Sequence, residues 1–85
     1  MTRAEFYEKY GDVKVKFFAY YKYTFRYQAC LPDGNRLECE YGGCSDAIYR
    51  HDVDADSEQR VYDLTPFSGR VYEEDGTIID DFHDY

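Results

Sequence analysis

The sequence has no tryptophan and no apolar run near the roughly 18–20 residues that a membrane-spanning helix requires. Its first five residues (MTRAE) do not follow the charged-then-apolar order of a secretory signal, so we do not expect secretion. Three cysteines are an odd number, which argues against a closed disulfide framework. The absences together predict a reducing, cytoplasmic location with thiols that are free or metal-bound.

Aliphatic residues are also scarce. Leu, Ile, Val and Phe number 17 of the 85 residues, close to the level typical of disordered chains. Eleven tyrosines offset this shortage, because a Tyr ring buries apolar area while its hydroxyl can stay in water. We therefore expect a single domain, residues 1–85, with a core of Tyr and Phe. Some of these rings should remain exposed, and Tyr is enriched in protein interfaces.

Basic residues are rare in the second half, so the charge of the chain is split in two. Residues 1–37 carry seven Lys/Arg and four Asp/Glu, a net charge of +3. Residues 38–85 carry three Lys/Arg and fourteen Asp/Glu, a net charge of −11, and the sum is −8. A clustered basic face for phosphates is missing, so we expect no direct binding of nucleic acid. The layout predicts a monomer or weak dimer with one strongly negative surface that engages a basic protein partner.

The clearest structural signal is an alternation of apolar and polar residues over residues 13–31, in which aromatic side chains are frequent. This stretch is longer than an ordinary strand, which predicts either one long bent strand or two strands broken near residues 19–22. Phe18 and Tyr20 interrupt the polar face at that point. They either cover a helix or form an exposed patch, and together with Tyr21 they are candidates for an aromatic interface.

Residues 32–35 (PDGN) have the composition of a turn. Apolar side chains stay opposite apolar ones in the return strand if the pairs are Leu31 with Leu37, Ala29 with Cys39, and Tyr27 with Tyr41. This register predicts a loop of residues 33–35 with Asn35 in the left-handed conformation, and it places Cys30 and Cys39 on opposite faces. A two-residue turn at residues 33–34 would shift the register by one and bring both cysteines onto one face.

Helices are expected before and after this hairpin. Thr2 and Glu5 form a capping box that predicts a helix over residues 3–10, with Gly11 as a left-handed stop. A helical turn is expected at residues 48–50. A further helix is expected at about residues 55–64, with its inward-facing side chains at Val61, Tyr62 and Leu64.

Residues 70–73 and 77–79 flank a second turn and predict a second hairpin. The expected fold is therefore α+β: an antiparallel sheet from two hairpins, one of them long and aromatic-rich, with a short N-terminal helix and one or two helices between the hairpins.

Four soft ligands lie within 22 residues and could form a tetrahedral zinc site: Cys30, Cys39, Cys44 and His51. Their spacing, C-x8-C-x4-C-x6-H, is not a standard zinc-knuckle pattern, and the opposite faces of Cys30 and Cys39 work against the full set. The set of Cys39, Cys44 and His51, either alone or with His83 as a fourth ligand, is least affected. Alternatively, the thiols are ordinary small buried side chains. No cofactor other than zinc is indicated.

No complete catalytic motif is present. A nucleophile would need Cys or Ser beside His and an orienting carboxylate. Neither a glycine-rich oxyanion loop nor a strand-to-helix elbow surrounds Cys44, His51 or His83. We therefore expect a protein that is not an enzyme and has no catalytic residues.

Acidic residues concentrate in two segments of the second half. The candidates for partner binding are Asp46, Asp52, Asp54, Asp56, Glu58, Asp63, Glu73, Glu74 and Asp75. Such charge can serve solubility alone. It can also act as a DNA mimic, because carboxylates on a rigid scaffold can occupy a groove whose Lys and Arg side chains normally grip phosphates.

A small, strongly acidic, Tyr-rich domain without catalytic motifs resembles the phage-encoded inhibitors of bacterial defence, the anti-CRISPR proteins among them. The resemblance lies in size, charge and aromatic content, and no motif carries it. It implies an inhibitor in the bacterial host cell that blocks a nucleic-acid-handling enzyme, such as a CRISPR effector nuclease, without chemistry. Two other classes stay open: a small zinc-stabilised structural or adaptor domain, and an antitoxin or immunity-type partner protein.

Overall fold

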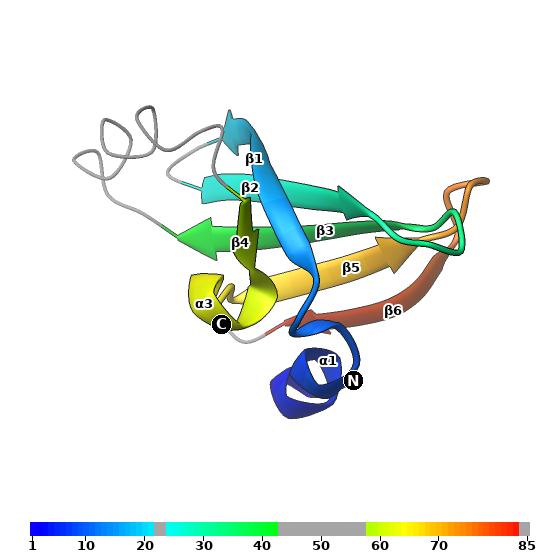
Figure 1. Ribbon diagram of the computed structural model, residues 1–85, viewed down its shortest axis with the longest axis horizontal. Helices are drawn as coiled ribbons and strands as arrows, with labels where there is room; N and C mark the ends of the chain where they lie inside the picture. Colours follow the sequence, from blue (N-terminus) through cyan, green and yellow to red (C-terminus); the bar gives the residue numbers. More distant parts are fainter. Residues whose placement is uncertain (22–23, 43–57, 84–85) are drawn as a thin grey trace.

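The computed structural model describes residues 1–21, 24–42 and 58–83, whose strands form one antiparallel sheet (Figure 1). The elements of this part of the chain are α1 (Arg3–Tyr10), β1 (Lys14–Tyr21), β2 (Thr24–Cys30), β3 (Arg36–Gly42), β4 (Glu58–Arg60), α3 (Val61–Leu64), β5 (Ser68–Tyr72) and β6 (Ile78–His83). The strand order is β4-β1-β2-β3-β5-β6, and every pair is antiparallel. The α+β class and the antiparallel sheet from two hairpins agree with the expectation, and strand β4 is an addition that was not predicted.

The aromatic stretch forms two strands, β1 and β2, so the broken alternative is the correct one. Phe17 pairs with Tyr27, but the next pair joins Ala19 to Arg26, which leaves Phe18 as an extra residue in a β-bulge. An extra residue reverses which face each later side chain occupies. Tyr20 therefore lies on the same face as Phe25, with ring centroids 5.4 Å apart, and the regular alternation expected through residue 31 stops at the bulge.

The register between β2 and β3 differs by two residues from the predicted one. Its pairs are Ala29 with Leu37, Tyr27 with Cys39, and Phe25 with Tyr41. A shift of two keeps every side chain on its predicted face, so Cys30 and Cys39 do lie on opposite faces and the two-residue turn is wrong. The loop is residues 32–34, and Gly34 rather than Asn35 takes the positive φ, 90°. Glycine adopts this conformation without steric penalty.

The segment predicted as a helix over residues 55–64 is divided. Residues 58–60 are strand β4, which pairs with residues 14–16 of β1, and only residues 61–64 are helical. Pairing along the edge of β1 overrides the local helical tendency of this polar sequence. Val61 and Leu64 are buried as predicted, whereas Tyr62 is exposed. Residues 48–50, where a helical turn was predicted, lie outside the described residues.

Helix α1 packs against β6 on one face of the sheet (Figure 1). Its capping box is formed as predicted, with the Glu5 amide donating to the Thr2 hydroxyl and the Thr2 amide donating to the Glu5 carboxylate. Gly11 is right-handed (φ −59°), so the predicted left-handed stop is wrong. Glycine is needed there because a Cβ atom would come 2.3 Å from the ring of Tyr62.

Asp80 of β6 ties α1 to the sheet. Its carboxylate accepts hydrogen bonds from the Lys9 ammonium, at 2.8 Å, and from the Tyr10 hydroxyl. Burial opposes ionisation of this carboxyl, but the hydrogen bonds from Lys9 and Tyr10 outweigh it and lower the pKa of Asp80. The three side chains thus form a charged anchor between the helix and the edge strand.

Five of the eleven residues of the buried core are aromatic, so the predicted core of Tyr and Phe is confirmed only in part. Its buried members come from α1, α3 and the inner face of the sheet: Phe6, Tyr10, Val15, Phe25, Tyr27, Leu37, Cys39, Val61, Leu64, Val71 and Phe82. Neither helix of the described part has the length and apolar character needed to cross a bilayer.

Candidate functional site

Two turns of the same construction lie side by side at one end of the sheet (Figure 1). In the first, the Leu31 amide donates to the Asn35 carbonyl at 2.8 Å and the Gly34 amide donates to the Leu31 carbonyl at 3.0 Å. The second, residues 73–77, repeats both hydrogen bonds at 2.8 and 2.9 Å, and Gly76 has φ 91°. A Cβ atom on Gly34 would lie 3.0 Å from Glu74 Oε1, so the two turns are in close proximity.

These turns carry four exposed carboxylates, which we call the acidic end: Asp33, Glu73, Glu74 and Asp75. Within the described part of the chain, no Lys, Arg or His forms an ion pair with any of them. The sequence reasoning found the last three but missed Asp33, which lies in the net positive half. The signal that could have found it is the repeated Asp-Gly pair of the two turns.

Hydrogen bonds within the turns hold two of the four carboxylates in place. Asp33 accepts from the Asn35 backbone amide at 3.1 Å, and Asp75 accepts from the Thr77 backbone amide at 2.9 Å. The bond from Thr77 lowers the pKa of Asp75, so this carboxyl stays ionised through the neutral range. Two of the four carboxylates on this negatively charged surface are therefore preorganised.

Two other predicted acidic contacts lie in the described part of the chain, and neither joins the acidic end. Glu58 lies on β4, and Asp63 lies on α3, where it is paired with Arg60 at 3.1 Å. Arg60 also pairs with Asp12 at 3.5 Å, so it is shared between two carboxylates and compensates the charge of Asp63 only in part. The remaining candidates lie outside the described residues: Asp46, Asp52, Asp54 and Asp56.

Two of the three predicted aromatic contacts are exposed side chains. Phe18, the bulge residue, and Tyr20 both belong to the C-terminal half of β1. Tyr21 is the last residue of that strand, and its side chain lies outside the description. Figure 1 places this end of β1 far from the two acidic turns, so the aromatic and acidic candidates are separate surfaces.

The predicted metal ligands are divided between the faces of the sheet. Cys30 is exposed on the polar face, whereas Cys39 is buried in the core beside Tyr27. Burial, followed by the charges of Glu40 and Glu38, raises the pKa of Cys39 to about 12 and disfavours the thiolate that zinc requires. Cys44 and His51 lie outside the described residues. Among the residues that are described, no three His, Cys, Asp or Glu side chains come together as a metal site.

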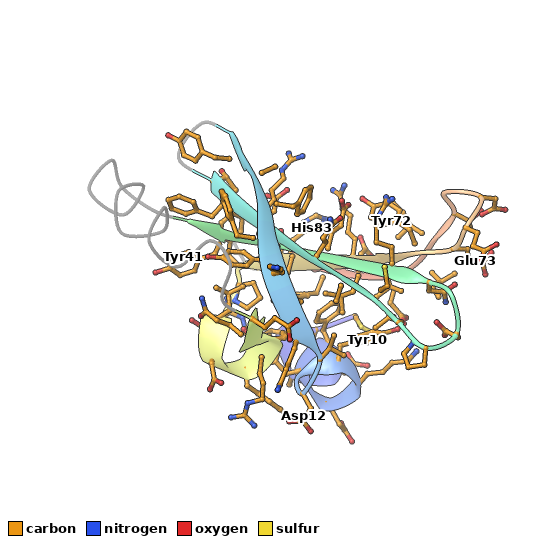
Figure 2. The ribbon with its side chains drawn as sticks, turned by 45° about the horizontal axis from the view of Figure 1, so that its top comes forward. Tyr10, Asp12, Tyr41, Tyr72, Glu73 and His83 are labelled. Carbon is orange, nitrogen blue, oxygen red and sulfur yellow. The ribbon has the colours of Figure 1, made fainter. Side chains whose placement is uncertain are left out.

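The face of the sheet opposite α1 is polar, and Figure 2 shows Tyr72 and His83 on that side, away from Tyr10. Its charges alternate from strand to strand: Arg26 of β2 pairs with Glu40 of β3 at 3.5 Å, and Arg70 of β5 faces Asp81 of β6. A hydrogen bond to Tyr72, together with the nearby carboxylates, raises the pKa of Arg70. We call this surface the open face.

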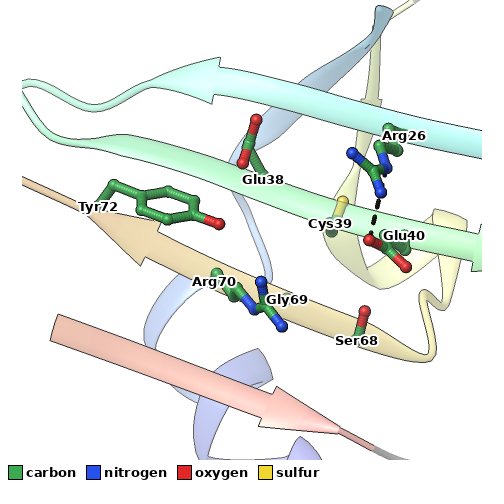
Figure 3. A pocket seen from close by; sticks show the side chains of 8 residues that line it. All are labelled: Arg26, Glu38, Cys39, Glu40, Ser68, Gly69, Arg70 and Tyr72. Carbon is green, nitrogen blue, oxygen red and sulfur yellow. Dashed lines mark ion pairs between the residues drawn. The ribbon is translucent and has the colours of Figure 1, made fainter. Parts of the chain in front are cut away.

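A hollow of about 70 Å³ lies on the open face, over β2, β3 and β5 (Figure 3). The side chains that surround it are those of Arg26, Glu38, Glu40, Ser68, Arg70 and Tyr72, and the strand segments at Cys39 and Gly69 complete the lining. Sequence reasoning did not find it, because its residues come from three strands, and only Cys39 among them belongs to a candidate motif.

No family model matches the chain, and no curated protein or solved structure shows significant similarity to it. Its function must therefore be argued from the surfaces themselves.

Proposed function

We propose that the protein is a non-enzymatic binding protein that presents its acidic end to a basic groove of a nucleic-acid-handling bacterial protein, such as a CRISPR effector nuclease. In this hypothesis it acts as a DNA mimic in the cytoplasm of the host cell, as a monomer or weak dimer. The observation that carries the proposal is the pairing of two Asp-Gly turns, which presents four exposed carboxylates without a partner cation in the described part of the chain.

The preorganisation of these turns supports this reading. A flexible acidic loop would lose conformational entropy on binding, whereas turns closed by backbone hydrogen bonds lose little. Carboxylates form strong, geometrically defined hydrogen bonds with arginine, the side chain that also grips phosphates. A dense negative surface also speeds the encounter with a basic partner.

The size of two hollows among the described residues favours a macromolecular partner over a small substrate. The hollow on the open face holds about 70 Å³, and another beside β3 and α3 holds about 190 Å³. Typical small-molecule sites hold about 300–1,000 Å³. Both hollows are therefore too small for an ordinary substrate or cofactor.

The proposal is tested by capturing partners from a bacterial lysate with two variants of equal charge. Glu73→Gln/Glu74→Gln removes two carboxylates of the acidic end, and Glu8→Gln/Asp12→Asn removes two exposed ones elsewhere. An identified partner should bind the first variant at least about tenfold more weakly than the wild type, which corresponds to ~1.4 kcal/mol. The second variant should bind nearly normally.

Competition and salt complete the test. DNA or guide RNA should displace the protein from its partner, and affinity should fall as salt shortens the screening length to about 8 Å near physiological ionic strength. Equal loss from both variants, or an affinity that ignores salt and nucleic acid, would overturn the acidic end as the contact surface.

A further inference from the structure

Two isoleucines at the start of β6 are exposed, although this chain has few aliphatic side chains. Of the nine Leu, Ile and Val residues in the described part, only Ile78 and Ile79 are exposed, at 47% and 42%. Single apolar side chains on a surface are ordinary, whereas an adjacent pair outside a core that is short of aliphatic residues indicates a contact surface.

The pair lies at an uncovered part of the sheet edge. β6 is the last strand in the order β4-β1-β2-β3-β5-β6, so it has a neighbouring strand on one side only. The contacts of α1 with β6 lie further along the strand, at Asp80 and Phe82. Figure 1 shows α1 beside the C-terminal part of β6, away from the turn that precedes Ile78.

The local backbone disfavours the addition of another strand along this edge. The register between β5 and β6 shifts after Val71, whose partner is Asp80, so Ile79 is an extra residue in a β-bulge. A bulge at a sheet edge interrupts the ladder that an added strand would extend. The isoleucine pair is therefore available for contacts through its side chains rather than through backbone pairing.

Tyr72 extends this apolar surface on the open face. It is half-buried and is the cross-strand partner of Ile78, and partner side chains lie on the same face of a sheet. The guanidinium of Arg36 lies over the ring of Tyr72, 4.9 Å from its centroid. Arg36 is itself paired with Glu38 at 3.8 Å, so this pair adds no net charge beside the apolar surface.

The charge around the isoleucine pair favours a cationic partner. Residues 73–81 contain five carboxylates and no lysine or arginine. The cations that face these carboxylates are Lys9, Arg70 and the Met1 ammonium, and all three lie at residues 80–81. Residues 73–75, which precede the pair, carry three carboxylates that form no ion pair within the described part of the chain. A second copy of the chain would bring the same carboxylates, so charge opposes self-association here.

We propose that Ile78, Ile79 and Tyr72 form the apolar centre of the partner contact and receive an aliphatic side chain that lysine or arginine flanks in the partner protein. This inference rests on the proposed function for the basic character of the partner, and it deepens that function by adding an apolar contact to the acidic end. Charges at the rim of an interface mainly speed the encounter, whereas apolar side chains at its centre slow dissociation.

The test uses two synthetic peptides of equal charge, acetyl-Lys-Leu-Lys-Leu-Lys-amide and acetyl-Lys-Gly-Lys-Gly-Lys-amide. Each is titrated into the ¹⁵N-labelled protein and followed by NMR. The leucine peptide should shift the backbone amide signals of residues 72–79 and bind about fivefold more tightly than the glycine peptide, which corresponds to ~1 kcal/mol. The difference arises because only the leucine peptide buries apolar area against the isoleucine pair.

Three variants separate the apolar contact from the charge. Ile78→Thr/Ile79→Thr should bring the ratio of the two affinities close to one and leave the glycine peptide unchanged. Glu73→Gln/Glu74→Gln should weaken both peptides and keep the ratio. Phe18→Thr is the matched control, because it removes an exposed apolar side chain at another part of the sheet, and it should change neither affinity. Thermal melting checks that all three remain folded.

Equal affinity of the two peptides for the wild type, or a fivefold ratio that persists in Ile78→Thr/Ile79→Thr, would overturn the apolar centre alone. Signals of residues 72–79 that shift with protein concentration in the absence of peptide would also overturn it, in favour of a second copy. Unchanged binding of both peptides in Glu73→Gln/Glu74→Gln would instead count against the acidic end, and with it the proposed function.

Discussion

The ring of Phe6 lies against the backbone of Gly69, so close that a Cβ atom at position 69 would come 2.6 Å from it. Phe6 is fully buried on α1, and its ring centroid is 4.7 Å from that of Phe82 on β6. Because Gly69 has no side chain, the ring of Phe6 can pack directly against β5, and this contact joins α1 to the sheet.

Gly69→Ala should lower the free energy of unfolding by about 1–3 kcal/mol, the usual range for overpacking a core. Urea denaturation measures the change, and Gly42→Ala is the control, since the nearest atom there is a movable Phe67 ring carbon at 3.3 Å. In a double-mutant cycle, Phe6→Leu should relieve part of the loss. Equal stability of Gly69→Ala and wild type would mean that the packing of α1 does not depend on the contact between Phe6 and Gly69.

The second prediction concerns the turns that build the acidic end. Gly76 has φ 91° and open space around its Cβ position, so Gly76→Ala should cost about 1–2 kcal/mol through backbone strain alone. Gly76→Asn should cost less, because Asn tolerates the left-handed region. Urea denaturation of both variants checks the order. A loss from Asn as large as that from Ala would contradict the conformational explanation.

Local signals in the sequence predicted those features that depend on nearby residues. The capping box at Thr2 and Glu5 fixed the start of α1, and alternation fixed the faces of β2 and β3. Tyrosine content predicted the aromatic part of the core. Each of these follows from spacing or composition within one element, so no knowledge of the fold was required.

Features set by contacts between elements could not be predicted in the same way. A register shift of two leaves every face unchanged, so alternation cannot exclude it, and the geometry of the turn at Gly34 decides. The alternation pattern does not reveal the bulge at Phe18, because apolar residues flank it on both sides. Strand β4 forms through its pairing with residues 14–16 of β1. The acidic end forms because two turns that are distant in the sequence lie close together in the fold.

The third prediction separates the thiols. Cys30 is exposed on the open face and should react with a thiol reagent in the native protein at pH 8, whereas buried Cys39, with its pKa raised to about 12, should react only after unfolding. Mass spectrometry of labelled peptides with and without urea measures both. The two thiols should also not be joined in a disulfide, because they lie on opposite faces. Native labelling of Cys39 at the rate of Cys30 would show that the core opens readily.

The fourth prediction tests the zinc hypothesis. Metal analysis of protein purified without added zinc should find a stoichiometric ion if Cys44 and His51 take part in a site. Cys30→Ser should not change the metal content, because Cys30 lies on the face opposite Cys39. Loss of zinc in that variant would contradict the ligand set that excludes Cys30, and metal-free, fully folded protein would remove zinc from the function.

The last prediction is a pH dependence that originates at Asp80. Its pKa is lower in the folded protein than the ordinary value of 3.8, because hydrogen bonds from Lys9 and Tyr10 outweigh burial. A lowered pKa means that the ionised carboxylate favours folding. The stabilisation is fully present above the unfolded pKa, and it is lost as the pH falls through the folded value, below about 3.8.

Asp80→Asn should therefore reduce the free energy of unfolding by about 1–3 kcal/mol at pH 7, the range for a hydrogen bond to a charged group. The difference from wild type should shrink when both are unfolded by urea below pH 3.8. Asp81→Asn is the matched control, because it is the same change one residue on, at a side chain 46% exposed against 13% for Asp80. It should stay within about 0.5 kcal/mol of wild type. A constant deficit of Asp80→Asn at every pH would show that shape rather than charge links α1 to β6.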